Sequence, residues 1–410
     1  MIWLDDNGIT AESVLDTNSK HVVGEYEALL ASASDEFEFA DFDENTVATT
    51  FYTSGTTGNP KGVFFTHRQL VLHSLTLVAT FAMMPEGQGV SFNDVYMPAT
   101  PMFHVHAWGM PYTSTMCGLK QVYPGRYIPE LMVNLIKQEG VTFTHGVPTV
   151  LQMLLQQAEV SDTHFDGLKM TIGGSKLTEG LAKAGMARGI KCVTGYGMSE
   201  TAPLLCTTDV IDTSLSEDEQ ISQRCKTGKP VLMVDVQLWS DNNELVPADG
   251  ESTGELVVRT PWLTQSYFKN EDKGNELWQG GYLHTGDIAK MDADGTVQIT
   301  DRLKDVIKSG GEWISSLELE TILSLHPSVA DIAVIGVEDE QWGERPLALV
   351  VKKATHAETE AEEIRALAEQ AVERGLLPSY GVPKQFKFLD ELPKTSVGKH
   401  DKKVMRTMFG

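Results

Sequence analysis

Basic residues are scarce in this chain, and their scarcity restricts its partners. The 410 residues include 33 Lys and Arg against 57 Asp and Glu, which gives a net charge of −24 at pH 7. A surface with this balance repels polyanions, so nucleic acid and anionic membranes are excluded as main partners.

Cysteine is also rare, and long apolar runs are missing. Because Cys117, Cys192, Cys206 and Cys225 form no C-x-x-C pair and lack metal-ligand spacing, we expect free thiols in a reducing compartment. The first residues lack the basic and apolar regions of a secretory signal. The most apolar segment, 70–84, is too short to span a bilayer and has the spacing of a buried helix. A cytoplasmic protein without integral membrane association is therefore expected.

Strand and helix patterns alternate from residue 48 to about 240. The predicted strands are 141–144, 170–172 and 190–194, and the predicted helices are 149–157 and 178–188. This βαβαβ order predicts a largely parallel sheet with helices on both faces. Since ligands of such sheets bind at the carboxyl ends of the strands, Gly173-Gly174 and Gly195-Tyr196-Gly197 are expected near one site.

Changes of pattern divide the chain into parts. Residues 1–46 are acidic and irregular, with a helical patch near 25–33, and residues 232–239 and 254–259 indicate a smaller β region. Beyond residue 300, Ser315-x-x-Glu318 is a capping box whose helix is expected to stop at His326-Pro327, and further strands and a helix follow. The fold class is therefore α/β: a large domain, 47–300, with parallel sheets, helices and a small β region, and an α+β domain, 305–410.

A glycine-rich loop, Thr53–Gly62, lies between the predicted strands 47–52 and 63–65. Its glycines let backbone N–H groups approach a ligand, and its lysine offers a charge to phosphate oxygens. It differs from the common P-loop, which has Gly-Lys-Ser/Thr ahead of a helix. The pattern predicts a polyphosphate site, with an ordinary surface turn as the alternative. The residues expected at the phosphates are Thr53, Ser54, Gly55, Thr56, Thr57, Gly58 and Lys61.

Further motifs have residue types suited to a nucleotide. In Gly195–Thr201, glycines permit close approach to a planar ring, Tyr196 can stack on it, and Glu200 offers the oxygen that Mg²⁺ prefers. In Tyr282–Asp287, the carboxylate can accept two hydroxyl donors, as a ribose diol requires. Taken alone, these motifs are equally compatible with a turn capped by Ser199 and a turn aspartate. The segment 301–313 is a charged run with Trp313, and 393–399 ends in a lysine beside glycine.

In this order, the motifs resemble those of the adenylate-forming superfamily, which comprises acyl-CoA synthetases, firefly-type luciferases and peptide-synthetase adenylation domains. The resemblance covers residues 47–410 and implies ATP and coenzyme A as co-substrates and Mg²⁺ as cofactor. It implies a remnant of the family's N-terminal region at 1–46, a hinge at 301–304 and a mobile C-terminal domain. A homodimer remains an alternative to a monomer.

The resemblance also implies roles for single residues around ATP and the metal ion. Tyr196 would stack on adenine, Ser199 would contact the α-phosphate, and Asp287 would bind the ribose. Arg302 would hold the ribose or a phosphate. Glu200 would bind Mg²⁺, with Thr53 as a second contact. The other residues implied at the nucleotide are Gly174, Thr194, Gly195, Gly197 and Trp313.

The implied catalytic residues are lysines and one histidine. Lys399 would bridge the substrate carboxylate and the α-phosphate, where an ammonium stabilises charge developing on phosphoryl oxygens. Lys304 corresponds to the family's hinge position, and Lys308 would face the adenylate after the small domain has rotated. His104 resembles the gate between the acyl pocket and the thiol tunnel.

Residues 101–108 contain His-x-His, but no third ligand is evident, so zinc is disfavoured. By resemblance, Trp108 corresponds to the tunnel gate of bacterial long-chain fatty acyl-CoA synthetases, and Gly109, Val147 and Met198 line the acyl pocket. The absence of an acidic residue in 101–110 disfavours a peptide-synthetase domain, and the absence of G-x-S-x-G disfavours serine hydrolysis.

The expected function is ATP-dependent activation of a fatty acid to an acyl-adenylate, followed by transfer to coenzyme A. The products would be acyl-CoA, AMP and pyrophosphate. Nothing specific favours a luciferase-like oxygenase. The alternatives are a truncated, inactive nucleotide-binding relative and an enzyme that activates another carboxylic acid.

Overall fold

The computed structural model describes residues 2–3, 24–53, 60–85, 87–209, 212, 214–240, 242–310, 312–395 and 399–410. The chain divides into two compact units, 1–46 and 47–410. In the first unit, β1 (Ile2–Trp3) pairs in parallel with β2 (Gly24–Glu25). Helix α1 (Tyr26–Ser32) follows and is capped by the Glu25 carboxylate, which accepts from the Ala28 N–H at 2.8 Å. This helix confirms the predicted patch.

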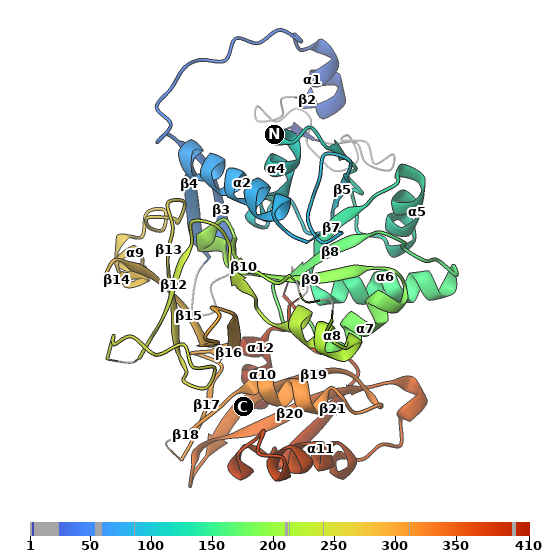
Figure 1. Ribbon diagram of the computed structural model, residues 1–410, viewed down its shortest axis with the longest axis vertical. Helices are drawn as coiled ribbons and strands as arrows, with labels where there is room; N and C mark the ends of the chain where they lie inside the picture. Colours follow the sequence, from blue (N-terminus) through green and yellow to red (C-terminus); the bar gives the residue numbers. More distant parts are fainter. Residues whose placement is uncertain are drawn as a thin grey trace. The chain divides into compact units, whose positions relative to one another are not determined.

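A mainly parallel sheet forms the centre of the second unit (Figure 1), with strand order β11-β10-β9-β8-β7-β5-β6. The pairs among β5 to β9 are parallel, and β10 and β11 are antiparallel additions. The strands are β5 (Val95–Pro98), β6 (Lys120–Gln121), β7 (Phe143–Gly146), β8 (Lys169–Gly173), β9 (Lys191–Gly197), β10 (Leu204–Thr207) and β11 (Lys229–Pro230).

The apolar run predicted that strand β7 would begin at Val141, but the strand begins at Phe143. Gly140 ends the preceding helix in the left-handed conformation, and the Val141 N–H bonds the Ile136 carbonyl at 3.0 Å, so these residues belong to the helix terminus.

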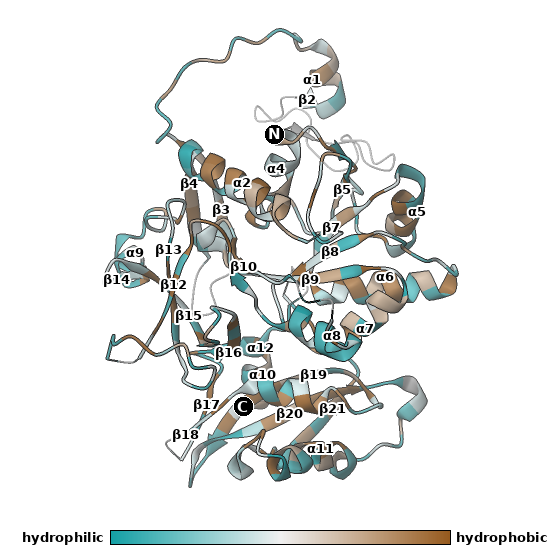
Figure 2. Cartoon of the chain, viewed as in Figure 1, coloured by the Kyte–Doolittle hydropathy of each residue, from teal (hydrophilic) through white to brown (hydrophobic). Residues whose placement is uncertain are grey.

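Helices cover both faces of this sheet, which confirms the predicted α/β fold. Tyr96 and Phe143 belong to the core that α2 completes, whereas Met97 and Met170 belong to the core beneath α5, α6 and α7. Apolar residues follow the strands and α6 in Figure 2, whereas α8 is mostly hydrophilic. The helices are α2 (His67–Ala82), α3 (Val105–Trp108), α4 (Met110–Met116), α5 (Pro129–Glu139), α6 (Pro148–Val160), α7 (Glu179–Ala187) and α8 (Glu217–Cys225).

Helix α2 begins at the predicted cap. The Thr66 side chain accepts from the Gln69 N–H, and the Gln69 side chain accepts from the Thr66 N–H, which completes a capping box. Only one face of α2 is buried, because Val71 and Leu75 are about half exposed (50% and 49%). The helix is therefore less buried than its composition predicted.

The smaller β region is antiparallel and lies beside the hairpin of β3 (Val47–Thr53) and β4 (Lys61–Thr66) in Figure 1. Its register places Asp287 on β15 opposite Arg302 on β16. The predicted strand 232–239 begins only at Asp235, since the segment before it forms a turn. The elements are β12 (Asp235–Trp239), β13 (Gly254–Arg259), α9 (Glu271–Leu277), β14 (Trp278–Gln279), β15 (Tyr282–Met291) and β16 (Val297–Arg302).

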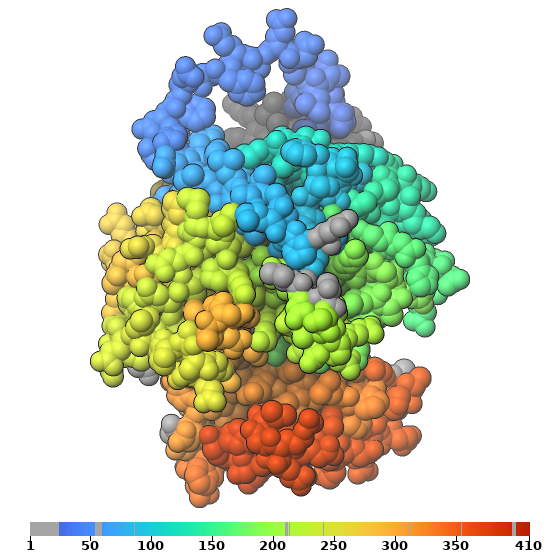
Figure 3. Space-filling model, viewed as in Figure 1, coloured from blue at the N-terminus to red at the C-terminus, as the bar shows by residue number. Residues whose placement is uncertain are grey.

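The C-terminal residues form a sheet of their own, ordered β18-β17-β20-β19 with β21 beside β20. Helices α10 and α11 share a core on one face, and Met405 of α12 belongs to the core on the other. Figure 3 shows this part in orange and red, separated by a seam from the green and yellow body. The elements are β17 (Ile307–Ser309), β18 (Glu312–Ile314), α10 (Ser316–Leu323), β19 (Val329–Asp339), β20 (Gly343–Lys352), α11 (Ala361–Glu373), β21 (Gln385–Leu389) and α12 (Lys402–Phe409).

The predicted cap of α10 is present, since the Ser315 hydroxyl accepts from the Glu318 N–H at 3.0 Å. The helix ends at Leu323, somewhat before the predicted stop at His326-Pro327. None of the helices in the described ranges is long and apolar enough to cross a membrane.

Candidate active site

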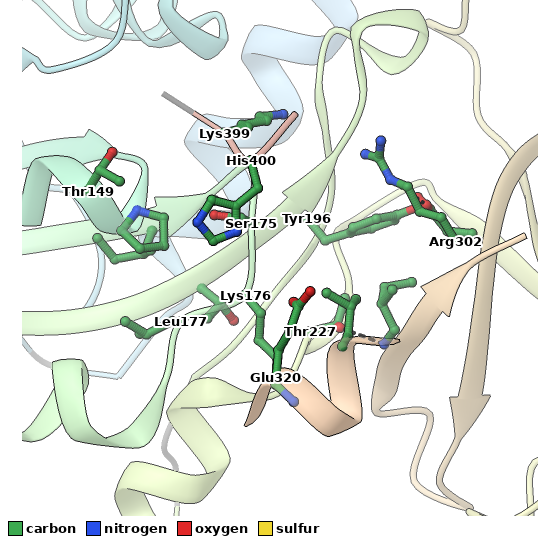
Figure 4. Close-up of a pocket in the computed structure, with 18 of the residues that line it drawn as sticks. Thr149, Ser175, Lys176, Leu177, Tyr196, Thr227, Arg302, Glu320, Lys399 and His400 are labelled. Atoms are coloured by element: carbon green, nitrogen blue, oxygen red, sulfur yellow. Dashed lines mark hydrogen bonds and ion pairs between the residues drawn. The ribbon is translucent and has the colours of Figure 1, made fainter. Parts of the chain in front are cut away.

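A continuous cavity of about 2020 Å³ lies at the carboxyl ends of β8 and β9 and extends to the C-terminal elements. Its walls come from motifs that are far apart in the sequence, and Figure 4 shows part of them as sticks. The predicted site residues that line it are Thr53, Lys61, His104, Trp108, Gly174, Thr194, Gly195, Tyr196, Gly197, Met198, Ser199, Glu200, Asp287, Arg302, Lys304 and Lys399.

Three of these side chains form one hydrogen-bonded group. The Tyr196 hydroxyl donates to one carboxylate oxygen of Asp287 at 2.6 Å, and the Arg302 Nε lies 3.2 Å from the other oxygen. Burial, together with the adjacent carboxylate, raises the pKa of Tyr196 well above its usual value, so the hydroxyl stays protonated. The arrangement presents an aromatic ring beside a buried carboxylate, as the predicted adenine and ribose contacts require.

A second group surrounds the predicted metal-binding carboxylate. Glu200 is buried, and its Oε1 accepts from the Tyr267 hydroxyl at 2.7 Å. The Lys61 ammonium lies 4.6 Å from the centre of the same tyrosine ring. Thr53 borders the cavity at the end of β3, whereas the predicted phosphate contacts Ser54, Gly55, Thr56, Thr57 and Gly58 lie outside the described residues.

These oxygens suit Mg²⁺ rather than a metal held by the protein alone. Glu200 and Thr53 both line the cavity, and Mg²⁺ at nucleotide sites commonly takes one or two carboxylates plus phosphate oxygens. Within the described ranges, no group of three or more His, Cys, Asp or Glu side chains has a metal-binding arrangement. His106 of the His-x-His pair instead bonds the Thr49 hydroxyl through its Nε2 at 2.6 Å.

Glycines at the two strand ends leave room for functional groups. Gly174 has a φ of +78°, and a Cβ there would lie 2.8 Å from Lys399 Cε, so the lysine occupies space that a side chain would fill. At Gly197 a Cβ would lie 1.8 Å from the Pro203 carbonyl oxygen, which only glycine avoids. The Thr194 hydroxyl donates to the Lys226 carbonyl at 2.5 Å.

Burial in the cavity lowers the pKa of Lys399, Lys304 and His104. Burial lowers the pKa of Lys399 to about 8, with Arg302 and Lys304 adding to the effect and Asp287 opposing it. Burial, and then Arg302, lowers the pKa of Lys304 to about 8 as well. The pKa of His104 falls to about 4, through burial and then Lys399, so this imidazole is neutral at pH 7.

A left-handed turn carries the predicted gate residues. Val105, His106, Ala107 and Trp108 all have positive φ, between 47° and 61°, and Gly109 closes the turn at 72°. Such a run is rare for residues other than glycine and costs about 1–2 kcal/mol per residue. The Trp108 ring lies 4.8 Å from the ring of His145, which is itself held by the Tyr96 hydroxyl at 2.7 Å.

One arm of the cavity is apolar. It extends from the left-handed turn toward α2 and β7, and the residues that line it are almost fully buried. These residues are Leu77, Phe81, Val105, Met110 and Phe143. Phe81 and Phe143 meet edge to face, with ring centres 5.8 Å apart. The arm is therefore suited to a hydrocarbon group.

Four predicted residues lie elsewhere. Lys308 and Trp313 face each other across the β17–β18 pair and are largely exposed, with the ammonium 5.8 Å from the indole. Gly109 and Val147 are not among the described residues that line the cavity. Gly109 contacts the ring of His73, and Val147 packs beside Gly174.

Several residues in or beside the cavity were not predicted from the motifs. Tyr267 holds Glu200 from a segment 67 residues away, and His145 supports Trp108 from β7. Lys176 follows Gly173-Gly174-Ser175 directly, and only its position after a glycine-bearing strand end could have indicated a role.

Comparison with known proteins agrees with this geometry. Residues 1–268 match the family model of AMP-binding enzymes, and residues 318–399 match the AMP-binding enzyme C-terminal domain. The long-chain-fatty-acid–CoA ligase of Thermus thermophilus is 41% identical over 363 residues, which are 87% of this chain and 65% of that protein. The 3-methylmercaptopropionyl-CoA ligase of Ruegeria lacuscaerulensis is 40% identical over 94% of this chain and 70% of that protein. The chain thus spans about two thirds of the length of these relatives.

A solved structure with the same fold is the o-succinylbenzoate CoA synthetase of Bacillus subtilis in complex with its acyl-adenylate intermediate. It superimposes with a TM-score of 0.78 and 26% identity, over 99% of this chain and 78% of that protein. With a matching family model over more than half its length, the chain belongs to the AMP-binding enzymes of the adenylate-forming superfamily.

Proposed function

We propose that this chain activates a fatty acid with ATP and transfers the acyl group to coenzyme A. One observation supports this most strongly: a single cavity joins the polar group of Tyr196, Asp287 and Arg302 to an apolar arm, with Lys399 at the polar end. A nucleotide and a hydrocarbon chain could therefore meet beside one ammonium group. The names of the similar ligases are compatible with this substrate class.

In the first step, a carboxylate oxygen attacks the α-phosphorus of ATP. The new P–O bond forms the acyl-adenylate, and the bond to the bridging oxygen of pyrophosphate breaks. Lys399 would neutralise charge on the carboxylate and the α-phosphate, and Lys61 would do so on the outer phosphates. Glu200 and Thr53 would hold Mg²⁺, which lowers the repulsion between the attacking anion and the triphosphate.

In the second step, the thiol of coenzyme A releases its proton to water, its sulfur forms a bond to the acyl carbon, and the bond from that carbon to the AMP oxygen breaks. Lys308 and Trp313 lie outside the cavity and Lys399 lines it, which is the arrangement that the proposed first step would require. A rotation about residues 301–304, the proposed hinge, would exchange the two sets. Activation as an adenylate supplies the leaving group that a free carboxylate lacks.

The decisive experiment is ATP–pyrophosphate exchange by the purified chain with short-, medium- and long-chain fatty acids. 3-Methylmercaptopropionate and o-succinylbenzoate complete the panel. Exchange with fatty acids is expected. Exchange with only one of the other acids would replace the proposed substrate, and no exchange from a folded sample would favour an inactive nucleotide-binding relative.

The two steps are then separated with Lys399→Ala. Exchange should collapse in this variant, while transfer from a chemically prepared acyl-adenylate to coenzyme A should persist. Equal loss of both activities would contradict the assignment of separate groups to the two steps.

A further inference from the structure

We propose that Lys176 is a positioning residue that docks the C-terminal elements in the arrangement required for adenylate formation. This inference rests on the proposed function. Lys176 follows the glycine-bearing end of β8, and its ammonium donates to the Thr321 hydroxyl oxygen of α10 at 2.9 Å. The contact links residues 145 positions apart, and it joins the sheet that carries Tyr196 to the part that carries Lys399.

The acceptor is oriented for this contact. The Thr321 hydroxyl donates its own proton to the Leu317 carbonyl at 2.7 Å, so its oxygen is available to accept from Lys176. Carboxylates favour the ammonium from both sides: Glu318 and Glu320 belong to α10, and Glu179 belongs to α7. Burial opposes them and lowers the lysine pKa. The site therefore holds a partly desolvated cation, whose hydrogen bonds are among the stronger ones in proteins.

Helix α10 transmits the position of Lys176 to the loop that carries Lys399. Glu320, adjacent to Thr321, forms an ion pair with Lys402 at 2.7 Å, and the two side chains are only 13% and 10% exposed. Lys402 begins α12, which directly follows the Lys399 loop. A desolvated pair of this kind resists separation, because either charge alone would remain buried.

A second set of contacts involves described residues on both sides of Lys399 in the sequence. Asp331 of β19 binds the Lys394 ammonium at 3.1 Å and the His400 Nε2 at 2.9 Å, so it contacts both sides of the loop. Helix α10 and β19 share one core, which includes Leu319 and Ile332. Docking α10 on Lys176 would therefore position Lys399 through the contacts of its described neighbours.

The contact requires α10 to face the end of β8. A rotation about residues 301–304 that removed Lys399 from the cavity would separate Lys176 from Thr321. Lys176 should consequently support adenylate formation and contribute nothing to thioester formation. This differs from a lysine that contacts a phosphate, whose loss would raise the KM for ATP or coenzyme A.

The test compares Lys176→Met and Thr321→Val with Lys183→Met. Lys183 is a control on α7, with a 55% exposed side chain paired to Asp218. We expect Lys176→Met to lower kcat for pyrophosphate exchange roughly tenfold, the size of one lost hydrogen bond to a charged group. The KM for ATP should stay within about twofold, and transfer from a prepared acyl-adenylate should be unchanged. Thr321→Val should reproduce the loss, and the double variant should add little to it.

A second readout needs no activity. Amide hydrogen exchange of α10 and α12 should be faster in Lys176→Met and Thr321→Val than in Lys183→Met, all measured with Mg·ATP. If the two variants exchange faster than Lys183→Met but the wild type activates no acid, the docking role stands and the proposed function is rejected. If the wild type is active, the inference is overturned when Lys176→Met equals Lys183→Met both in kcat for pyrophosphate exchange and in amide hydrogen exchange. The inference would also be overturned if Lys176→Met lost both half-reactions equally. It would be overturned as well if Lys176→Met raised the KM for ATP while Thr321→Val had no effect.

Discussion

Raising the pH above 8 should stop adenylate formation by removing the proton of Lys399. Burial lowers the pKa of this lysine from 10.5 to about 8, which corresponds to a loss of about 3 kcal/mol in the stability of its charged form. A lysine whose pKa is lowered is still charged below that pKa and becomes neutral above it. About one tenth of the molecules would therefore keep the ammonium at pH 9, and the rate would fall about tenfold for each further pH unit.

The assay is pyrophosphate exchange between pH 6 and 10, with kcat/KM for ATP and kcat evaluated separately. The kcat/KM profile reports the free protein and should fall above pH 8. The kcat profile reports the complex, in which phosphate charges favour the ammonium, so its fall should begin at a higher pH. His104 should cause no change between pH 6 and 8, since its pKa is lowered to about 4.

Lys304 provides a necessary control, because its pKa is also lowered to about 8. In Lys399→Arg, the guanidinium stays charged, so the alkaline fall should disappear even though the different geometry lowers the maximum rate. Lys304→Arg should keep the fall. The assignment to Lys399 is refuted if Lys399→Arg retains the fall near pH 8, or if the wild-type kcat/KM is flat to pH 10.

Further predictions concern the nucleotide, the metal ion, the acyl chain and the core. Asp287→Asn weakens the ion pair with Arg302 and should raise the KM for ATP by about tenfold or more with a smaller change in kcat; an unchanged KM would contradict a ribose contact. Chelation of Mg²⁺ should abolish pyrophosphate exchange and re-addition restore it, whereas persistence of exchange would remove the metal from the mechanism. Phe81→Ala enlarges the apolar arm and should shift kcat/KM toward longer acids by about 1–3 kcal/mol, measured as a ratio between two chain lengths. Leu151→Ala removes a fully buried side chain and should lower the free energy of unfolding by about 2–5 kcal/mol in urea titrations.

Residue patterns predicted part of the polar end of the cavity. Glycines at the ends of β8 and β9 predicted that Gly174 and Tyr196 would lie near one site, because parallel strands present their carboxyl ends at one sheet edge. The pairing of Asp287 with Arg302 depends on the register of β15 and β16, and register cannot be obtained from either motif alone.

Other contacts of the site could not be predicted from the residues around them in the sequence. Tyr267 reaches Glu200, and Lys176 reaches Thr321, across chain segments whose meeting depends on the packing of several elements. Threonine and lysine in a helix or loop are usually solvated, so neither residue type indicated a contact. Local propensities likewise missed the left-handed turn at 105–108, because residues other than glycine and asparagine rarely adopt it.

That turn has a consequence for any attempt to stabilise the protein. Val105 and Ala107 hold a backbone conformation that glycine would adopt without steric cost, so Ala107→Gly should relax the backbone locally. The same relaxation would loosen the support of Trp108, whose ring fills the space next to Gly173. Thermal stability and the proposed gating by Trp108 would thus depend on the same few residues, and a library designed to improve one should be screened for the other.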